Sequence, residues 1–268
     1  MRIPLPESLR PPASGGGMPA EPRDAATIAL VRDGERGLET YLLRRRSTLE
    51  FAPGVLVFPG GGVHEPDRQM TRWLGPEPAE WAARFGCDEA TARGLVVAAI
   101  RETYEESGVL FASGKDSEPV LGDMAAMVAE RHALDRRELD FGEFLAAHGL
   151  YIRTDLLGAW AHWVTPAFEP KRFDTRFFVA AVPAGQETGD LPGEADRAAW
   201  WPIADIWKEL ESGSSMMLPP TSVTCGELDG LTVAELPGIV AERVFRRIEP
   251  MLVDVDGQLY LDYALEVP

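Results

Sequence analysis

The sequence predicts an α+β fold, in which strands and amphipathic helices follow one another along one globular chain. Of the 268 residues, 45% are hydrophobic, which is enough for a buried core. Short aliphatic and β-branched runs between turn signals indicate strands, and a long helical pattern covers 88–107 and ends at Gly108. We therefore expect one domain over 23–268.

The N-terminal part divides into a tail and a hairpin. Residues 1–22 are rich in proline and glycine, a composition typical of a disordered tail. The runs 27–31 and 39–44 flank a turn at Asp33-Gly34 and predict an antiparallel hairpin. A short buried strand at 55–58 then leads through Pro59 into three glycines, 60–62, whose backbone has unusual freedom.

The rest of the chain alternates between helical and extended patterns. Residues 63–87 are less regular. Their Trp73 and Trp81 are expected to seat this segment on the core, the alternative being that they cover a base. The further expected elements are one or two surface helices in 119–150, strands at 164–166, 177–182 and 194–201, helices at 203–210 and 233–248, and a hairpin turn at 256–257.

The charge and composition exclude several classes of protein. With 26 basic and 43 acidic side chains the net charge is −17, which argues against a non-specific grip on nucleic-acid phosphates. No apolar run is long enough to cross a bilayer, so no membrane partner is expected. Two cysteines without a secretory signal indicate a reduced, cytoplasmic setting. The expected partner is a small molecule, and self-association as a homodimer stays open.

The helix predicted at 88–107 gathers three carboxylates. Because an α-helix turns 100° per residue, Glu102, Glu105 and Glu106 share one face, and Val97, Ile100 and Tyr104 share the other. A solvated polar face is the alternative interpretation. However, like charges about 4 Å apart repel by about 4 kcal/mol at an effective dielectric of 20, and a divalent cation would turn that repulsion into binding.

This segment resembles the Nudix box, whose pattern is G-x5-E-x7-R-E-U-x-E-E-x-G-U, with U an aliphatic residue. The second half matches, except that Thr103 stands at an aliphatic position; the matching residues are Arg101, Glu102, Glu105, Glu106, Gly108 and Val109. Arg101 lies 40 positions after Gly61 instead of 14, which indicates an insertion of 26 residues, placed at about 63–92. Counted back from Arg101, the first glutamate of the pattern falls on Arg93, which cannot replace a carboxylate.

An interrupted box of this kind is similar to that of the coenzyme A diphosphatase-like branch of the Nudix hydrolases. Residues 51–61, 99–110, 160–166 and 173–178 agree with that branch, and the resemblance spans about 24–220. It implies a Nudix-type α/β/α sandwich with a mixed β-sheet, followed by a helical and hairpin extension over about 211–268.

The resemblance also implies roles for individual residues. Glu102, Glu105 and Glu106 would bind Mg²⁺ or Mn²⁺, with Glu102 either a ligand or the general base, and Arg101 would hold Glu102 in place. The candidates outside the helix are a fourth carboxylate at Glu194, which is otherwise a loop glutamate, and the substrate-binding residues Gly60, Gly61, Arg44, Arg46 and Arg176. The arginines are otherwise surface charges, and His64 and His162 are expected mainly to pack.

The expected activity is metal-dependent hydrolysis of a nucleoside diphosphate linked to another group, first of all coenzyme A or an acyl-coenzyme A. The signature of that branch carries a second arginine where this chain has Glu50-Phe51. ADP-ribose or a dinucleotide is therefore an alternative substrate. Because the first box glutamate is not found, a Nudix-fold binding protein without catalysis is a second alternative.

Overall fold

The computed structural model describes residues 2–4, 18–45, 54–116, 127–189 and 195–263. The strands are β1 (Arg2–Pro4), β2 (Arg23–Gly34), β3 (Gly37–Arg45), β4 (Val55–Val57), β5 (Gly60–Gly62), β6 (Trp73–Leu74), β7 (Ala112–Ser113), β8 (Tyr151–Arg153), β9 (Gly158–Val164), β10 (Phe173–Ala181), β11 (Ala195–Pro202), β12 (Met216–Met217), β13 (Arg247–Ile248), β14 (Met251–Val255) and β15 (Gln258–Asp262). The α-helices are α1 (Pro78–Phe85), α2 (Glu89–Ser107), α3 (Val128–Asp135), α4 (Phe141–Ala147), α5 (Ile203–Glu211), α6 (Pro219–Leu228) and α7 (Leu236–Glu242). The short 3₁₀ turns are η2 (Pro66–Gln69), η4 (Thr154–Leu156) and η5 (Val233–Glu235).

The central sheet is mixed and forks at β2. Its order is β12-β4-β3-β2-β10-β9-β13, with β10 parallel to β2 and β3 antiparallel to it. The glycine strand β5 pairs with residues 25–27 of β2, while β3 pairs with residues 31–34. Two strands therefore share one edge of β2, and β5 lies beside the fork.

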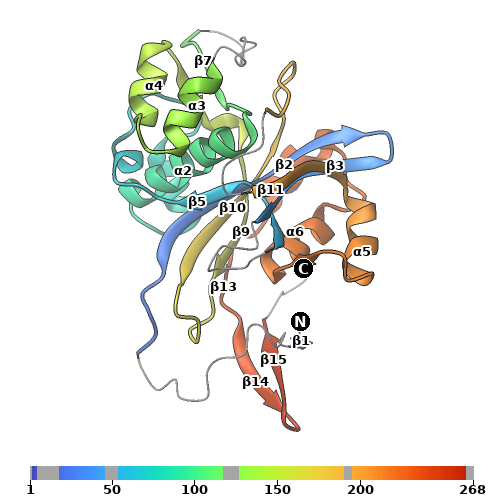
Figure 1. Cartoon of the computed structure of the whole chain (residues 1–268). Coiled ribbons are helices and arrows are strands. Elements are labelled where there is room, and N and C mark those ends of the chain that lie inside the picture. The colour runs from blue at the N-terminus through green and yellow to red at the C-terminus, as the bar shows by residue number, and fades with distance from the viewer. Residues whose placement is uncertain (1, 5–17, 46–53, 117–126, 190–194, 264–268) are drawn as a thin grey trace.

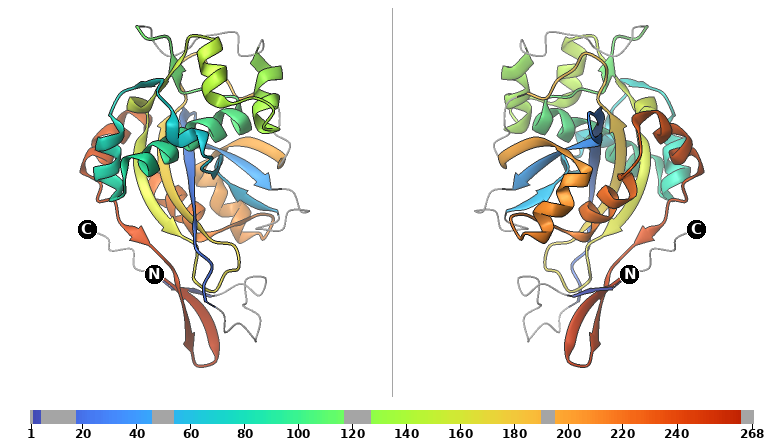
Figure 2. Two further views of the ribbon diagram at one scale, coloured as in Figure 1. Left: turned by 90° about the vertical axis from the view of Figure 1, so that its left-hand side faces the viewer. Right: turned by 90° about the vertical axis from the view of Figure 1, so that its right-hand side faces the viewer.

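Helices cover both faces of this sheet, which confirms the predicted α/β/α sandwich. Side chains of a strand alternate between its faces. Ile28 and Leu30 of β2 accordingly join a core cluster with α1, α2 and α4, whereas Ala29 and Val31 join a second cluster with α5, α6 and α7. Figures 1 and 2 show α2, α3 and α4 on one side of the strands and α5 and α6 on the other.

The segment between β5 and α2 packs on the core through aromatic residues. The Trp81 ring lies 5.7 Å from that of Phe178 in β10, and Phe85 of the same helix lies equally near Phe178. Trp73 donates its indole N–H to the carbonyl of Pro76 at 2.8 Å. Both tryptophans thus pack this segment against the core, as expected.

The C-terminal extension differs in part from its prediction. The helix expected over 233–248 ends at Glu242, and β13 instead adds a parallel strand to β9. Arg243 stops the helical path because its guanidinium lies 4.0 Å from the Trp160 ring and donates to the Trp160 carbonyl. The hairpin turn at 256–257 is as predicted, with positive φ at both residues.

A small three-stranded sheet projects below the sandwich in Figures 1 and 2 and contains both ends of the described chain. Arg2–Pro4 pairs with β15, and Arg2 contacts Asp262 at 3.2 Å. The sequence predicts a disordered tail over 1–22, but residues 2–4 form a strand because they pair with β15, which is distant in sequence. Residues 5–17 lie outside the described part of the chain. Within the described ranges, no helix is both long and apolar enough to cross a membrane.

Candidate active site

Helix α2 carries the predicted carboxylates and begins and ends where the sequence indicates. Asp88 caps it by accepting a hydrogen bond from the Thr91 N–H at 2.9 Å, and Gly108 ends it with φ 79°. Most of the helix is buried, and Glu102, Glu105 and Glu106 are buried or half-buried, which contradicts the alternative interpretation of a solvated polar face. Thr103, at the unusual position of the box, is fully buried and donates its hydroxyl to the Ala99 carbonyl at 2.7 Å.

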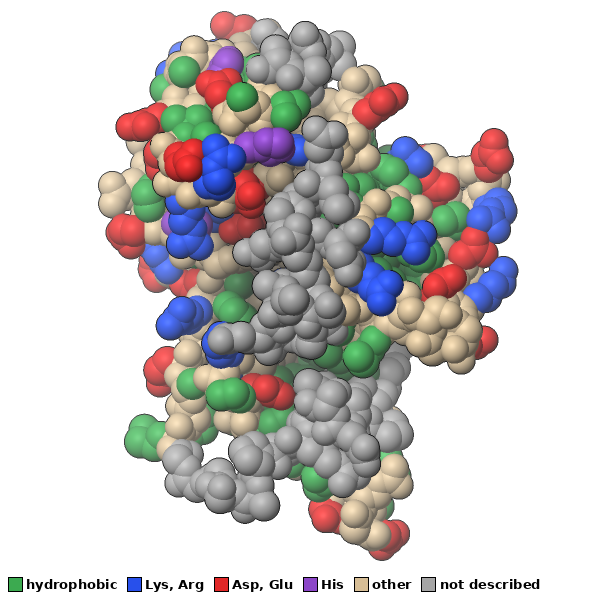
Figure 3. Space-filling view, in the orientation of Figure 1, with side chains coloured by type: hydrophobic (Ala, Val, Ile, Leu, Met, Phe, Trp, Pro, Cys, Tyr) green, Lys and Arg blue, Asp and Glu red, His purple; other side chains and the backbone are tan. Residues whose placement is uncertain are grey.

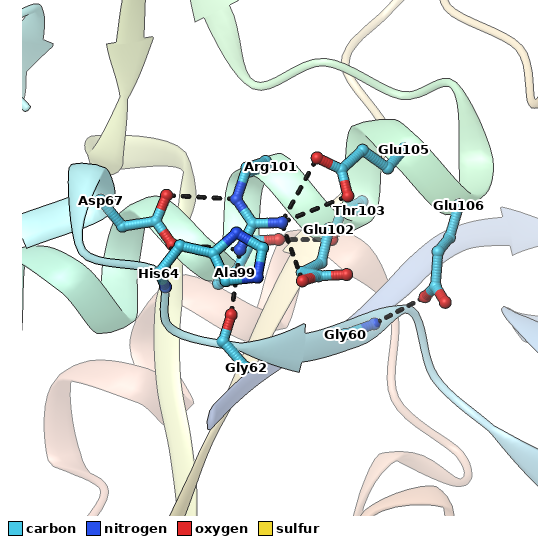
Figure 4. A network of polar contacts seen from close by, with 10 residues as sticks. All are labelled: Gly60, Gly62, His64, Asp67, Ala99, Arg101, Glu102, Thr103, Glu105 and Glu106. Carbon is cyan, nitrogen blue, oxygen red and sulfur yellow. Dashed lines mark hydrogen bonds and ion pairs between the residues drawn. The ribbon is translucent and has the colours of Figure 1, made fainter. Parts of the chain in front are cut away.

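Arg101 is the centre of the polar network drawn in Figure 4. It is 4% exposed, and its guanidinium binds the Asp67 carboxylate with two hydrogen bonds of 3.0 and 3.1 Å. The same group donates to Glu102 at 2.8 Å, to Glu105 at 3.2 Å and to the Gly62 carbonyl at 3.0 Å. A fork of five N–H donors is suited to such convergent binding. Arg101 therefore holds Glu102, as the resemblance implies.

Asp67 belongs to this network and is not among the residues predicted from the sequence. It is 3% exposed, and its carboxylate also accepts the His64 backbone N–H at 2.8 Å. Its position could have been found by counting from Gly61 toward the C-terminus. The Nudix pattern has its first glutamate six residues after its first glycine, and Asp67 is the sixth residue after Gly61. The position counted backward is wrong: Arg93 donates to the Met70 carbonyl at 2.6 Å. The extra residues therefore lie between Asp67 and Arg101.

The glycine strand β5 brings two of the carboxylates to one place. The Gly60 N–H donates to Glu106 at 2.8 Å, and a Cβ on Gly61 would lie 2.5 Å from the Glu102 carboxyl carbon. A Cβ on Gly60 would lie as close to the Ala26 carbonyl oxygen. Both glycines are therefore required by close approach, and Figure 4 shows Glu102 and Glu106 directed toward this strand.

Gly61→Ala should test this approach. We expect the new methyl group to displace the Glu102 carboxylate, at the end of a flexible side chain, so activity should fall at least about tenfold with little change in Tm. Gly62→Ala is the matched control, because its Cβ would meet only the Asp24 carbonyl at 4.0 Å. Comparable activity of the two variants would contradict the proposed crowding of Glu102.

Glu105 is placed differently from its two neighbours. It is 8% exposed and turned toward Arg101. Burial raises the pKa of Glu105 to about 7, with Arg101 opposing the shift and the charge of Glu102 adding to it. Burial beside Arg101 thus distinguishes Glu105 from Glu102 and Glu106, which are half-buried.

Of the candidate substrate-binding arginines, the structure describes Arg44 and Arg176, and neither is among the residues that Arg101 and its carboxylates contact. Arg44 is half-buried on β3, opposite Leu56 and Arg197. Arg176 is buried on β10, where it pairs with Asp174 and lies 5.9 Å from the Phe85 ring. Its contacts are those of a packed ion pair and not of an open anion site. Arg46 and Glu194 lie outside the described residues.

His162 is buried, as expected of a packing histidine, and its Nε2 lies 2.7 Å from Asp174. Burial and the charges of Arg176 and Arg247 lower its pKa to about 3. An unfolded histidine has a pKa near 6.5. Between these pH values the unfolded chain binds a proton at His162 that the folded chain does not bind. The free energy of unfolding therefore decreases as the pH falls from about 6.5 toward 3.

His162→Gln should remove this dependence. Between pH 7 and pH 5 we expect the wild-type protein to lose about 1–2 kcal/mol more unfolding free energy than the variant, since each pH unit inside the window is worth at most about 1.4 kcal/mol. Urea unfolding at the two pH values measures the difference. Parallel losses in both proteins would contradict a neutral buried His162.

Two cavities lie near the candidate site, one beside the glycine strand and one beside helix α2. One, of about 640 Å³, is lined by Gly60 and Gly61 together with residues of β2, β9 and β10. The other, of about 460 Å³, is lined by Asp67, Arg101 and Glu105, by His64 between Gly61 and Asp67, and by Arg137 from outside the box. Arg137 has φ 58° in the loop between α3 and α4, and no sequence signal marked it. On the face drawn in Figure 3, acidic and basic side chains are interspersed among the described residues.

Comparison with known proteins agrees with this fold and this helix. The sequence model of the NUDT19 Nudix domain matches residues 89–226, about half of the chain. The crystal structure of a NUDIX hydrolase from Alicyclobacillus acidocaldarius superposes with a TM-score of 0.66 and 30% identity, covering 82% of this chain and 96% of that one. The chain belongs to the Nudix hydrolase family.

A curated relative is similar over a shorter part of its length. The acyl-coenzyme A diphosphatase NUDT19 of Xenopus laevis is 24% identical over 217 residues, which are 68% of this chain and 57% of that protein. The chain thus aligns with little more than half of this relative.

Proposed function

We propose that this chain hydrolyses the diphosphate bond of a nucleoside diphosphate linked to another group, with coenzyme A or an acyl-coenzyme A as the first candidate. The observation that carries the proposal is the placement of Glu102 and Glu106 against the glycine strand, with Arg101 locked between Glu102 and Asp67. The name of the Xenopus laevis relative supports the coenzyme A candidate.

The residues of the site suit a hard divalent cation. Carboxylate oxygens are the ligands that Mg²⁺ and Mn²⁺ prefer, and Glu102 and Glu106 offer them on one side of α2, with Glu105 next to them. Among the described residues, no three acidic, histidine or cysteine side chains are already assembled around one point. Glu105 is held by Arg101 and Glu106 by Gly60, so binding would require these side chains to turn.

In the proposed reaction, each residue has a stated task. A bound Mg²⁺ or Mn²⁺ would neutralise the diphosphate oxygens and lower the pKa of the attacking water. Glu102 and Glu106 would hold the cation, and Glu102 could alternatively accept the proton of the water. Arg101 keeps Glu102 in its rotamer through the 2.8 Å contact, and Asp67 keeps Arg101 in place. Gly60 and Gly61 let the protein backbone approach the site closely, with no side chain between it and Glu102 or Glu106.

A panel of nucleotides tests the proposal. Purified full-length protein is incubated with Mg²⁺ or Mn²⁺ and with coenzyme A, ADP-ribose and a diadenosine polyphosphate, and the products are separated by chromatography. Release of 3′,5′-ADP supports coenzyme A, and release of AMP supports ADP-ribose or a dinucleotide. Tight binding without turnover of any member would reject hydrolysis in favour of a Nudix-fold binding protein.

A further inference from the structure

The smaller cavity has one wall that the box does not supply. Arg101 and Glu105 of α2 line it, and so do residues 137–140 of the loop between α3 and α4. Its volume of about 460 Å³ is within the range of small-molecule sites. Glu102 lies beside it, because Glu102 and Glu105 bind the same guanidinium. A ligand held at these carboxylates can therefore extend toward the loop.

The loop between α3 and α4 is fixed in its position relative to α2. Leu134 and Phe141, at its two ends, are buried in the same core cluster as α2. The Phe144 ring of α4 stacks on that of Tyr104 in α2, with 5.3 Å between the ring centroids. Side chains of the loop are therefore held next to the carboxylate helix by packing, before any ligand binds.

The carboxylates that line this cavity already have partners. An anion that enters would thus not meet a set of uncompensated negative charges. The partners are the box arginine for Asp67 and Glu105, Arg136 for Glu138, Arg68 for Glu65, and two backbone N–H groups of α4 for Asp140.

Arg137 differs from these groups. It is exposed and lines the cavity, and within the described ranges its guanidinium makes no hydrogen bond or ion pair. Burial lowers the pKa of His64 in the same lining, and the charges of Arg101 and then Arg137 lower it further. The positive charge of Arg137 thus acts inside the cavity, where it is available to an anion.

The backbone at Arg137 favours a different residue. Helix α3 ends in a Schellman turn, in which the N–H groups of Arg137 and Glu138 donate to Leu134 and Ala133, each at 2.8 Å. This turn gives Arg137 its φ of 58°, which glycine adopts without strain. The turn therefore does not explain an arginine at this position, and the strain is of the kind that accompanies functional residues.

We infer that Arg137 binds an oxygen of the substrate's diphosphate, so that the loop between α3 and α4 supplies a substrate-binding residue that the box does not contain. The inference rests on the proposed function for the presence of a diphosphate. A guanidinium presents a fork of N–H donors that matches phosphate oxygens. Because Arg137 has no ion pair to a described residue, binding an anion there breaks none.

The direct test is binding of methylenediphosphonate, a diphosphate analogue whose P–C–P bridge cannot be hydrolysed. In calorimetry with the full-length protein and Mg²⁺, Arg137→Gly should bind it at least about tenfold more weakly, because a charged hydrogen bond is lost. The same variant should raise Tm by about 2–4 °C, since glycine relieves the backbone strain. Arg137→Lys keeps the charge and should recover part of the affinity.

Arg136→Ala is the matched control. It removes an equal charge from the neighbouring position, but Arg136 pairs with Glu138 and does not line the cavity. This variant should bind methylenediphosphonate like the wild type.

The outcomes separate this inference from the proposed hydrolysis. Equal binding by the wild type and Arg137→Gly, or equal weakening in Arg137→Gly and Arg136→Ala, would overturn it even if the nucleotide panel shows turnover. Failure of the wild type to bind methylenediphosphonate would overturn it too. Weakened binding by an Arg137→Gly protein of raised Tm supports the inference even where no nucleotide is cleaved, because this binding requires no hydrolysis.

Discussion

Glu106→Gln is expected to lower kcat for diphosphate hydrolysis by about 100-fold or more, with Tm nearly unchanged. The substitution removes the charge proposed to hold the cation, and catalytic electrostatic groups of this kind are typically worth two to three orders of magnitude. The fold should persist because the glutamine carbonyl oxygen can still accept the Gly60 N–H, now at 2.8 Å from Glu106.

Steady-state kinetics over a range of Mg²⁺ and Mn²⁺ concentrations measures this effect. Glu143→Gln is the matched control, since Glu143 is exposed on α4 away from the carboxylate cluster, and it should retain wild-type kcat. A correctly folded Glu106→Gln protein with near-normal kcat would refute the role assigned to Glu106.

Asp67→Ala should cause the largest loss of stability, about 3–5 kcal/mol of unfolding free energy. Asp67 accepts two hydrogen bonds from the almost wholly buried Arg101 guanidinium, and a hydrogen bond to a charged group is worth about 1.5–3 kcal/mol. Glu102 and Glu105 would remain as partners of Arg101, so the loss expected is that of these two bonds and not of the whole network. Because Arg101 would then no longer fix Glu102, we also expect kcat to fall with little change in KM. Urea unfolding and kinetics of the surviving folded fraction measure the two effects.

Two further variants sharpen that experiment. Asp67→Glu restores a carboxylate of the type usual in the Nudix box and should recover most of the stability and activity. Asp24→Ala breaks an ion pair with Arg68 in which both side chains are about a quarter exposed, and it should cost about 1 kcal/mol or less. If Asp67→Ala is no more destabilising than Asp24→Ala, the buried pair is not what stabilises this region.

Local patterns in the sequence predicted the elements whose signals are local. The cap at Asp88 and the stop at Gly108 depend on neighbouring residues, and both agree with the structure. The hairpin joining β2 to β3 also forms, but its turn is at Glu35-Arg36 and not at the predicted Asp33-Gly34, which end β2. The second half of the box was found for the same reason, because Arg101 and the three glutamates lie within two turns of one helix.

Features that depend on distant partners could not be predicted in this way. The helix expected to reach residue 248 gives way to β13, since pairing with β9 and packing of Arg243 on Trp160 outweigh local helical preference. Arg176 lies beside Asp174 because residues two apart on a strand share a face, but only the packing of α1 on β10 puts it beside Phe85. Asp67 was missed because its partner, Arg101, lies 34 positions later.

The ion pair between Asp67 and Arg101 has a consequence for finding such proteins by pattern. It ties the segment after β5 to helix α2, so the stretch before that helix, 68–88, begins and ends at fixed points. The entropy of closing a flexible loop grows slowly, by about 0.6 kcal/mol per doubling of length, so the intervening stretch is free to vary widely. The two halves of the box are separated in the sequence, and the contact between Asp67 and Arg101 brings them together in the fold. A search with a fixed spacing would pass over this protein, whereas the two halves sought independently, Gly61 to Asp67 and Arg101 to Val109, are both present.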